Sequence, residues 1–153
     1  MSTLIRLERI PYEEPHHLEL WLTVASDGFS AHLTSYVNAD DLRRLGAAFS
    51  EFPFGGSAEV RYELGSEGPG DRAAYYLRLR LYLVRPTGAS GIEIRINNNE
   101  EPPTRRLAEF TLRSEVAGVN RLGALLTTFS KLDHRVLVWD GVDGALDPDG
   151  GAS

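Results

Sequence analysis

The residue types that carry most enzyme chemistry are scarce in this chain of 153 residues. It contains no cysteine, which excludes disulfides, thiol nucleophiles and zinc–thiolate sites. Four histidines occur, at His16, His17, His32 and His134. His16 and His17 are adjacent, and neighbouring side chains of a strand point in opposite directions, so they do not predict a shared metal ion. We therefore expect neither a metal nor another cofactor.

The acidic and glycine-rich segments do not match catalytic or ion-binding motifs either. Asp140, Asp143, Asp147 and Asp149 fall in a glycine-rich stretch, but the alternating ligands and final glutamate of an EF-hand are missing. Gly88–Gly91 reads Gly-Ala-Ser-Gly and is not a nucleophile elbow. Phosphate-loop and dinucleotide-binding fingerprints are absent from the sequence. This pattern favours a protein without catalysis and leaves an unrecognised enzyme as an alternative.

The charge of the chain is unevenly distributed. The formal net charge is −6, and residues 1–76 account for all of it, with 6 arginines against 12 acidic residues. An acidic chain without a basic run repels phosphate backbones, so we expect no nucleic-acid partner and favour a basic protein partner. Lys131 is the only lysine beside 15 arginines, a bias that indicates a GC-rich bacterial genome.

The length and hydropathy of the chain predict one domain in the cytoplasm. A chain of 153 residues suits a single ordinary domain. The sequence has no run of about 18 apolar residues, so we expect no transmembrane helix and no association with a membrane. Residues 1–10 also lack the uninterrupted apolar stretch of a secretory signal. The sequence does not indicate an oligomeric state.

Hydrophobic periodicity predicts strands and two helices. Apolar residues at every second position predict eight strands, at 3–10, 17–26, 29–37, 58–64, 75–85, 92–96, 107–113 and 135–139. Helical spacing predicts one helix over 39–52, capped by Asn38, and a second over about 115–132, capped by Ser114. We expect residues 141–153 to form a frayed tail.

A short repeat suggests that the chain consists of two related halves. Arg44-Leu45-Gly46-Ala47 recurs as Arg121-Leu122-Gly123-Ala124, 77 positions later, and the same offset aligns the preceding strands. This predicts pseudo-repeat halves of about 3–65 and 74–140, with Leu45 and Leu122 buried alike and both glycines at close contacts. The alternative is two unrelated strand–helix units that share amphipathic patterning.

These elements predict an α+β fold built by internal duplication. Each half would have a ββ(β)αβ-type order, in one mostly antiparallel sheet with both helices on one face. The alternative architecture is two four-stranded sheets that pack back to back as subdomains.

The strand phases place aromatic and arginine side chains together on the predicted open face of the sheet. This candidate interaction surface consists of Trp21, His32, Tyr36, Arg78, Arg80, Tyr82, Arg95 and Arg113. Three interpretations are open: cross-strand ion pairs with Glu19, Glu93 and Glu109, a protein interface, or a ligand surface.

The combined observations predict a bacterial binding or interaction protein without catalysis. In composition alone the chain resembles bacterial immunity and accessory proteins, which are small, acidic and free of catalytic motifs. The specific hypothesis is an immunity-type inhibitor of a basic protein partner. The alternative is a small-molecule binder or an unrecognised enzyme with a pocket between the two halves.

Overall fold

The computed structural model describes residues 3–14, 16–54, 59–67 and 73–148, and within these the chain forms nine strands and two helices. In chain order they are β1 (Thr3–Glu13), β2 (His17–Ser26), β3 (Phe29–Val37), α1 (Ala39–Glu51), β4 (Glu59–Gly65), β5 (Tyr76–Leu83), β6 (Ala89–Asn97), β7 (Leu107–Glu115), α2 (Val116–Phe129), β8 (Val136–Trp139) and β9 (Gly144–Asp147). Neither helix has the length and apolar character needed to cross a membrane.

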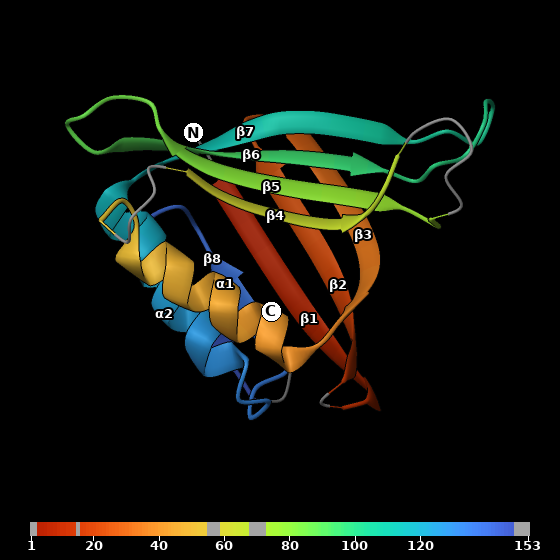
Figure 1. Cartoon of the computed structure of the whole chain (residues 1–153), viewed down its shortest axis with the longest axis horizontal. Helices are drawn as coiled ribbons and strands as arrows, with labels where there is room; N and C mark the ends of the chain where they lie inside the picture. The colour runs from red at the N-terminus through yellow and green to blue at the C-terminus, as the bar shows by residue number, and fades with distance from the viewer. Residues whose placement is uncertain (1–2, 15, 55–58, 68–72, 149–153) are drawn as a thin grey trace.

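The strands form two antiparallel sheets. Sheet A has the strand order β3-β2-β1-β8-β9, and sheet B has the order β4-β5-β6-β7. Figure 1 shows sheet B across the top, sheet A descending from it, and the two helices side by side along the remaining side. The α+β class is confirmed, but the single shared sheet is wrong. Each helix carries the chain from one sheet to the other, so the strand after a helix does not return to the sheet that preceded it.

Each sheet therefore contains a strand from the other half of the chain. After α1 the chain adds β4 to sheet B, where Val60 lies opposite Leu81 of β5. After α2 the chain adds β8 to sheet A, where Trp139 lies opposite Ile5 of β1. The ranges 3–65 and 74–140 are thus interleaved and do not fold into separate subdomains.

The two helices begin in different ways. Asn38 caps α1 as predicted, because its Oδ1 accepts a hydrogen bond from the Asp41 amide at 2.9 Å. The predicted cap of the second helix, Ser114, is wrong. Glu115 is the N-cap of α2 and makes no side-chain capping bond, while Ser114 lies in β7. The Ser114 hydroxyl instead donates to the Gly141 carbonyl at 2.6 Å, across the fold.

The contact between α1 and α2 depends on the repeated glycines, as predicted. A Cβ atom on Gly46 would lie 2.9 Å from the Gly123 carbonyl oxygen, and a Cβ on Gly123 would lie 2.7 Å from the Gly46 carbonyl oxygen. Both distances are shorter than atoms can approach without movement of the backbone. Glycine lowers helix propensity, and the close approach of two backbones compensates for that cost.

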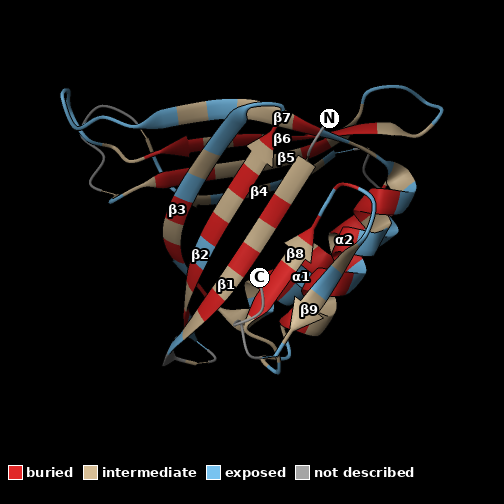
Figure 2. Cartoon of the chain, turned by 180° about the vertical axis from the view of Figure 1, so that it is seen from behind, coloured by how far each residue is buried: buried red, intermediate tan, exposed pale blue. Residues whose placement is uncertain are grey.

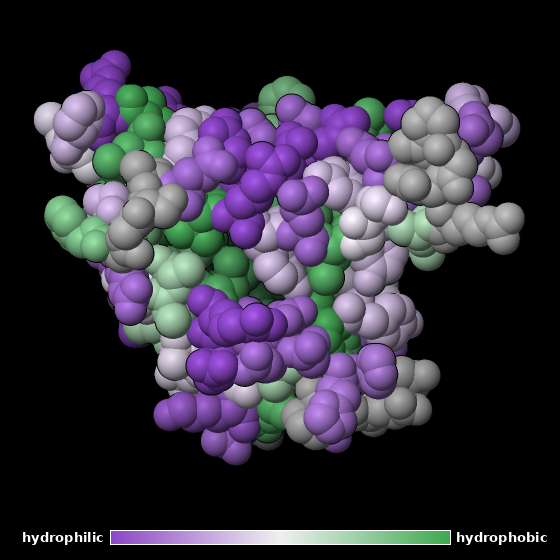
Figure 3. Space-filling model, viewed as in Figure 1, coloured by the Kyte–Doolittle hydropathy of each residue, from purple (hydrophilic) through white to green (hydrophobic). Residues whose placement is uncertain are grey.

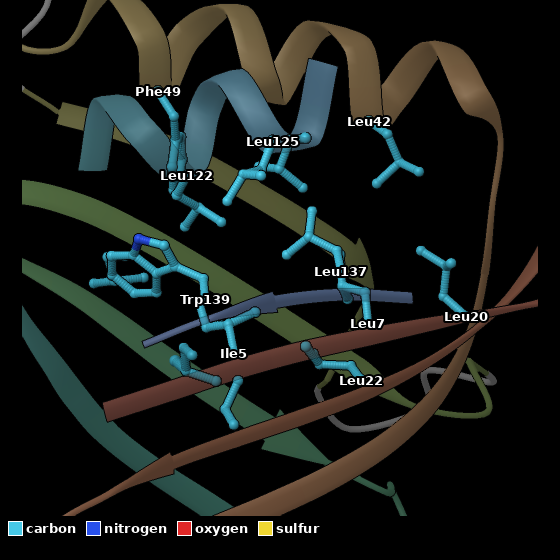
Figure 4. Packing of buried hydrophobic residues seen from close by; sticks show 14 of the residues in the cluster. Ile5, Leu7, Leu20, Leu22, Leu42, Phe49, Leu122, Leu125, Leu137 and Trp139 are labelled. Carbon is cyan, nitrogen blue, oxygen red and sulfur yellow. The ribbon is translucent and has the colours of Figure 1, made fainter. Parts of the chain in front are cut away.

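The core fills the space between the two sheets and the helices. Buried and less buried residues alternate along β1 and β2 of sheet A in Figure 2, as the period of two predicts. Figure 4 shows Trp139 of β8 next to Leu122 of α2. Leu122 is fully buried, but Leu45 is only partly buried against the same core. The prediction that the two leucines are buried alike is therefore wrong.

The C-terminal segment is more ordered than predicted. Strand β9 (Gly144–Asp147) pairs with β8, so the expected frayed tail is wrong for this part, and residues 149–153 lie outside the described chain. The turn before β9 is held by Asp140, whose Oδ1 accepts hydrogen bonds from the amides of Val142 and Asp143 at 2.9 and 2.8 Å. Gly141 provides the positive φ of 97° that this turn requires.

Candidate functional site

The structure divides the candidate interaction surface between two sheets. Trp21, His32 and Tyr36 lie on the outer face of sheet A, on β2 and β3. The remaining five lie on strands of sheet B: Arg78, Arg80, Tyr82, Arg95 and Arg113. The alternation within each strand was predicted correctly, but the assumption that all strands share one face was not. These eight residues therefore form two surfaces.

On sheet B the arginines are held in ladders of cross-strand ion pairs. Arg78 contacts Glu93 at 2.8 Å, and Arg80 bridges Glu93 and Glu59 at 3.3 and 3.2 Å. This arrangement matches the first of the three interpretations, in which the arginines pair with carboxylates of neighbouring strands. The positive charge of these side chains is neutralised within the sheet, which leaves little attraction for an external anion.

Arg95 extends the ladder to a residue outside the strands. It contacts Glu109 at 2.6 Å and Glu67 at 2.7 Å, and the hydrogen bond from Arg95 lowers the pKa of Glu67. Glu67 also accepts a hydrogen bond from the buried Asn97 at 2.6 Å. Sequence reasoning missed Glu67, because it follows β4 in a loop whose path no periodicity indicates. Glu59 could have been found only from the β4–β5 register.

Tyr82 and Arg113 occupy the other part of sheet B. The Arg80 guanidinium lies 4.2 Å from the centre of the Tyr82 ring, a cation–π contact. The same ring lies over Gly91, since a Cβ at that position would be 2.9 Å from it. Arg113 is exposed and lies opposite Gly91 on β7. Tyr82 therefore packs on its own sheet.

The outer face of sheet A carries a cluster of a different kind, which we name the sheet A aromatic patch: Trp21, His32 and Tyr36. The Trp21 and His32 rings meet edge to face, with centroids 6.3 Å apart. The indole Nε1 of Trp21 donates to Glu19 at 2.7 Å, which fixes the orientation of the ring. All three side chains are exposed, and β3 is an edge strand of the sheet.

A cavity lies in the interior, between the two sheets and both helices. Its volume is about 60 Å³. Leucine, isoleucine, valine and phenylalanine form nearly all of the lining, and Ser35 and Tyr62 supply its two polar side chains. Ser35 donates to the Leu20 carbonyl at 3.5 Å, and Tyr62 donates to Asp41 at 3.2 Å.

A surface groove of about 290 Å³ adjoins this cavity between α1 and β4. Leu45 and Tyr62 line both spaces. Figure 3 shows the junction as a green hollow between hydrophilic side chains of β4 and α1. Burial, together with the nearby Asp41 carboxylate, raises the pKa of Tyr62 far above its ordinary value. Tyr62 is therefore a neutral hydrogen-bond donor at physiological pH.

A wider open groove lies where α2 begins. It has a volume of about 710 Å³ and is lined by residues that include Arg85, Arg113, Ser114 and Asp140. Hydrogen bonds from the backbone amides of Asp143 and Val142 lower the pKa of Asp140, which is engaged in its own turn. Across the described ranges no three histidine, aspartate or glutamate side chains are grouped so that they could hold a metal ion.

The comparisons with known proteins do not extend these observations. The sequence matches no model of a known protein family, and no curated protein shows significant similarity to it. A functional assignment must therefore be argued from the surfaces and the cavity described above.

Proposed function

We propose that the protein is a non-catalytic binding protein and that a basic protein partner docks on the sheet A aromatic patch. The observation that carries this proposal is the contrast between the two outer faces. The arginines of sheet B that form the ladders are engaged with carboxylates, whereas Trp21 and Tyr36 remain 39% and 47% exposed. Large aromatic side chains with this exposure are typical of interface hot spots.

The geometry of the patch suits binding without large reorganisation. The Trp21 indole is held by Glu19 and by the edge of the His32 ring, and Thr23 contacts His32 Nδ1 at 3.3 Å. The side chains therefore lose little conformational freedom when a partner covers them. Tyr36 lies opposite Glu19 in the register of β2 and β3, which makes the patch continuous.

Charge supports a basic partner. Glu19 lies beside Tyr36, whereas Glu8 of β1, opposite Trp21, is paired with Arg6 at 3.1 Å, so Glu19 supplies the negative charge of the patch. Residues 1–76, which include the patch, carry the whole net charge of −6. Complementary charge accelerates encounter with a basic protein and suppresses binding of acidic ones.

Inhibition of a basic bacterial protein in the cytoplasm, as immunity-type proteins perform, is the specific form of this proposal. Such a role requires a shaped surface and no catalytic residues. It is supported by the exposed aromatic patch and by the net negative charge of residues 1–76.

We also propose that the fold arose by internal duplication. The segments β3–α1–β4 and β7–α2–β8 follow the same order at the offset of 77 residues that relates Gly46 to Gly123. In each half a three-stranded meander precedes the helix, and the strand after the helix joins the other sheet. This common order supports the proposal, and a shared ancestor would explain it.

The test compares immobilised wild-type protein with two variants of the patch and one control. Trp21→Ala and Tyr36→Ala remove the aromatic side chains, and Arg113→Ala removes an exposed side chain of sheet B. A partner captured at low salt is then purified and its affinity measured by calorimetry. We expect Trp21→Ala to weaken binding by about 30-fold or more, as hot-spot substitutions do. We also expect binding to weaken as salt rises, and Arg113→Ala to bind like the wild type.

Two results would overturn the proposal. One is a purified partner that binds Trp21→Ala and Tyr36→Ala as tightly as the wild type. The other is the absence of a specific partner at low salt.

A further inference from the structure

The interior cavity is a place where the packing of this protein is incomplete. A water molecule needs about 10–15 Å³ of such space, and the cavity offers about 60 Å³. A buried water also needs two to four polar partners. The two polar side chains of the lining, Ser35 and Tyr62, are already engaged within the protein. The cavity is therefore suited to apolar atoms.

The lining comes from both sheets and both helices, so an apolar group inside would contact every layer of the fold. It includes Leu7 and Leu22 of sheet A, Ile92 and Ile94 of sheet B, and Leu122 of α2. An apolar group that fills the space would restore the dispersion contacts that this aliphatic lining lacks, and a flexible hydrocarbon chain can follow its irregular surface.

The cavity has a route to the surface between α1 and β4. Strand β4 is an edge strand of sheet B, so only β5 holds it by a ladder of hydrogen bonds. The hydrogen bond from Tyr62 to Asp41 joins β4 to α1 at this point. Because Leu45 and Tyr62 line both the cavity and the outer groove, a displacement of the Tyr62 ring would connect the two spaces.

The outer groove carries two arginines and one carboxylate. Arg44 and Arg61 line it together with Asp41. Arg44 contacts Asp41 at 3.0 Å, and Arg61 contacts Glu63 at 3.0 Å, with the arginine side chains 66% and 48% exposed. Exposed ion pairs of this kind contribute little stability, so a ligand anion can replace a carboxylate partner at low cost.

We infer that the protein binds a single-chain amphiphile with an anionic head group, of which a fatty-acid carboxylate is the simplest example. The hydrocarbon chain passes between α1 and β4 and fills the cavity. The head group stays in the groove beside Arg44 and Arg61. This site is separate from the sheet A aromatic patch and does not depend on the proposed protein partner.

The first experiment titrates the full-length protein with hexanoate, octanoate and decanoate by calorimetry, below the concentrations at which they aggregate. Each methylene that enters the cavity should tighten binding by about fourfold, until the space is filled. Saturable binding of one ligand per protein, with this dependence on chain length, is the expected result. Absence of saturable binding, or an affinity independent of chain length, would overturn the inference.

The second experiment tests the head group with decanol and decyltrimethylammonium beside decanoate. Arg44→Gln and Arg61→Gln should each weaken the binding of decanoate by about two- to fivefold and leave the binding of decanol unchanged. Arg43→Gln is the matched control, because Arg43 is exposed on the same helix and does not line the groove. If decyltrimethylammonium binds as tightly as decanoate, the inference that the site prefers an anionic head group is wrong.

The third experiment locates the hydrocarbon chain of the bound ligand. Ser35→Leu adds apolar volume inside the cavity and should abolish decanoate binding in a folded variant. Because this substitution could also prevent folding, nuclear Overhauser contacts between decanoate and the wild-type protein are measured as well. We expect contacts from the decanoate methylenes to the methyl groups of Ile92, Ile94 and Leu122. Contacts confined to surface residues would contradict the cavity as the site.

Discussion

Gly46 of α1 and Gly123 of α2 lie directly against each other, so that a Cβ atom on either would come within 2.9 Å of the carbonyl oxygen of the other. We expect Gly46→Ala and Gly123→Ala each to destabilise the protein by about 1–3 kcal/mol, because the added methyl group meets backbone atoms of the other helix as well as a side-chain hydroxyl, and the backbone cannot move aside. Chemical denaturation monitored by circular dichroism measures this loss.

The exposed faces of the same helices provide the control. Ala47 and Ala124 adjoin the two glycines in sequence and point to solvent. At these positions alanine is preferred, so Ala47→Gly and Ala124→Gly should lose about 1 kcal/mol through helix propensity alone. If Gly46→Ala or Gly123→Ala stabilises the protein, the close contact between the helices is wrong.

Leu45 and Leu122 occupy matching positions in the sequence repeat but differ in burial. Leu122 is 1% exposed, and truncation to alanine should cost about 2–5 kcal/mol through lost burial and the cavity left behind. Leu45 is partly exposed at the groove, so Leu45→Ala should cost clearly less. Thermal and urea unfolding of the two variants provides the comparison. Equal losses would show that the two leucines are buried alike after all.

We expect substitution by phenylalanine to change the stability of the protein much more at one of the two tryptophans than at the other. Trp139 is fully buried in β8, and its Nε1 donates to the Gly118 carbonyl at 2.9 Å. Trp139→Phe loses this buried hydrogen bond and part of the packing of the larger indole ring, and it should cost about 1–3 kcal/mol in unfolding free energy. Trp21→Phe alters an exposed side chain and should change stability by less than about 0.5 kcal/mol. A neutral Trp139→Phe would argue against the placement of β8 beneath α2.

The ion pair between Glu67 and Arg95 predicts a dependence of stability on pH. The hydrogen bond from Arg95 lowers the pKa of Glu67 below its ordinary value of 4.5 in the folded protein. The stabilisation from this ion pair is therefore fully present above the pKa that Glu67 has in the unfolded chain. It is lost as the pH falls through the lower pKa that Glu67 has in the folded protein. Glu67→Gln should destabilise the protein at pH 7 and should differ little from the wild type at the acid end.

Unfolding free energies measured from neutral to acid pH test this prediction. Glu100→Gln serves as the control, since Glu100 is an exposed residue of a polar loop. A difference between wild type and Glu67→Gln that stays constant across the range would contradict the ion-pair explanation.

Local structure was largely predictable from the sequence, and strand pairing was not. The alternation of Leu18, Leu20, Leu22 and Val24 shows which face of β2 is buried, and Asn38 marks the start of α1. Periodicity gives no information on which strands become neighbours, so the transfer of β4 and β8 to the opposite sheets could not be foreseen. Strand β9 was missed because Gly144–Asp147 lies in a segment rich in glycine and aspartate, a composition that is typical of turns.

The candidate surfaces were also predictable only as far as strand periodicity reaches. The exposure of Trp21 and Tyr36 follows from strand phase, but their separation from Arg78 and Arg95 follows from sheet membership. The role of Glu67 depends on a loop conformation. The interior cavity arises from the fit of many side chains, and composition does not determine that fit.

The docking of a partner on Trp21 can be observed directly, because the chain contains two tryptophans in contrasting environments. Protein labelled with 5-fluorotryptophan gives one fluorine NMR signal for Trp21 and one for Trp139, which single Trp→Phe variants assign. On addition of the purified partner, we predict a large shift of the Trp21 signal and an unchanged Trp139 signal. A bound complex in which the Trp21 signal does not move would contradict the proposed function.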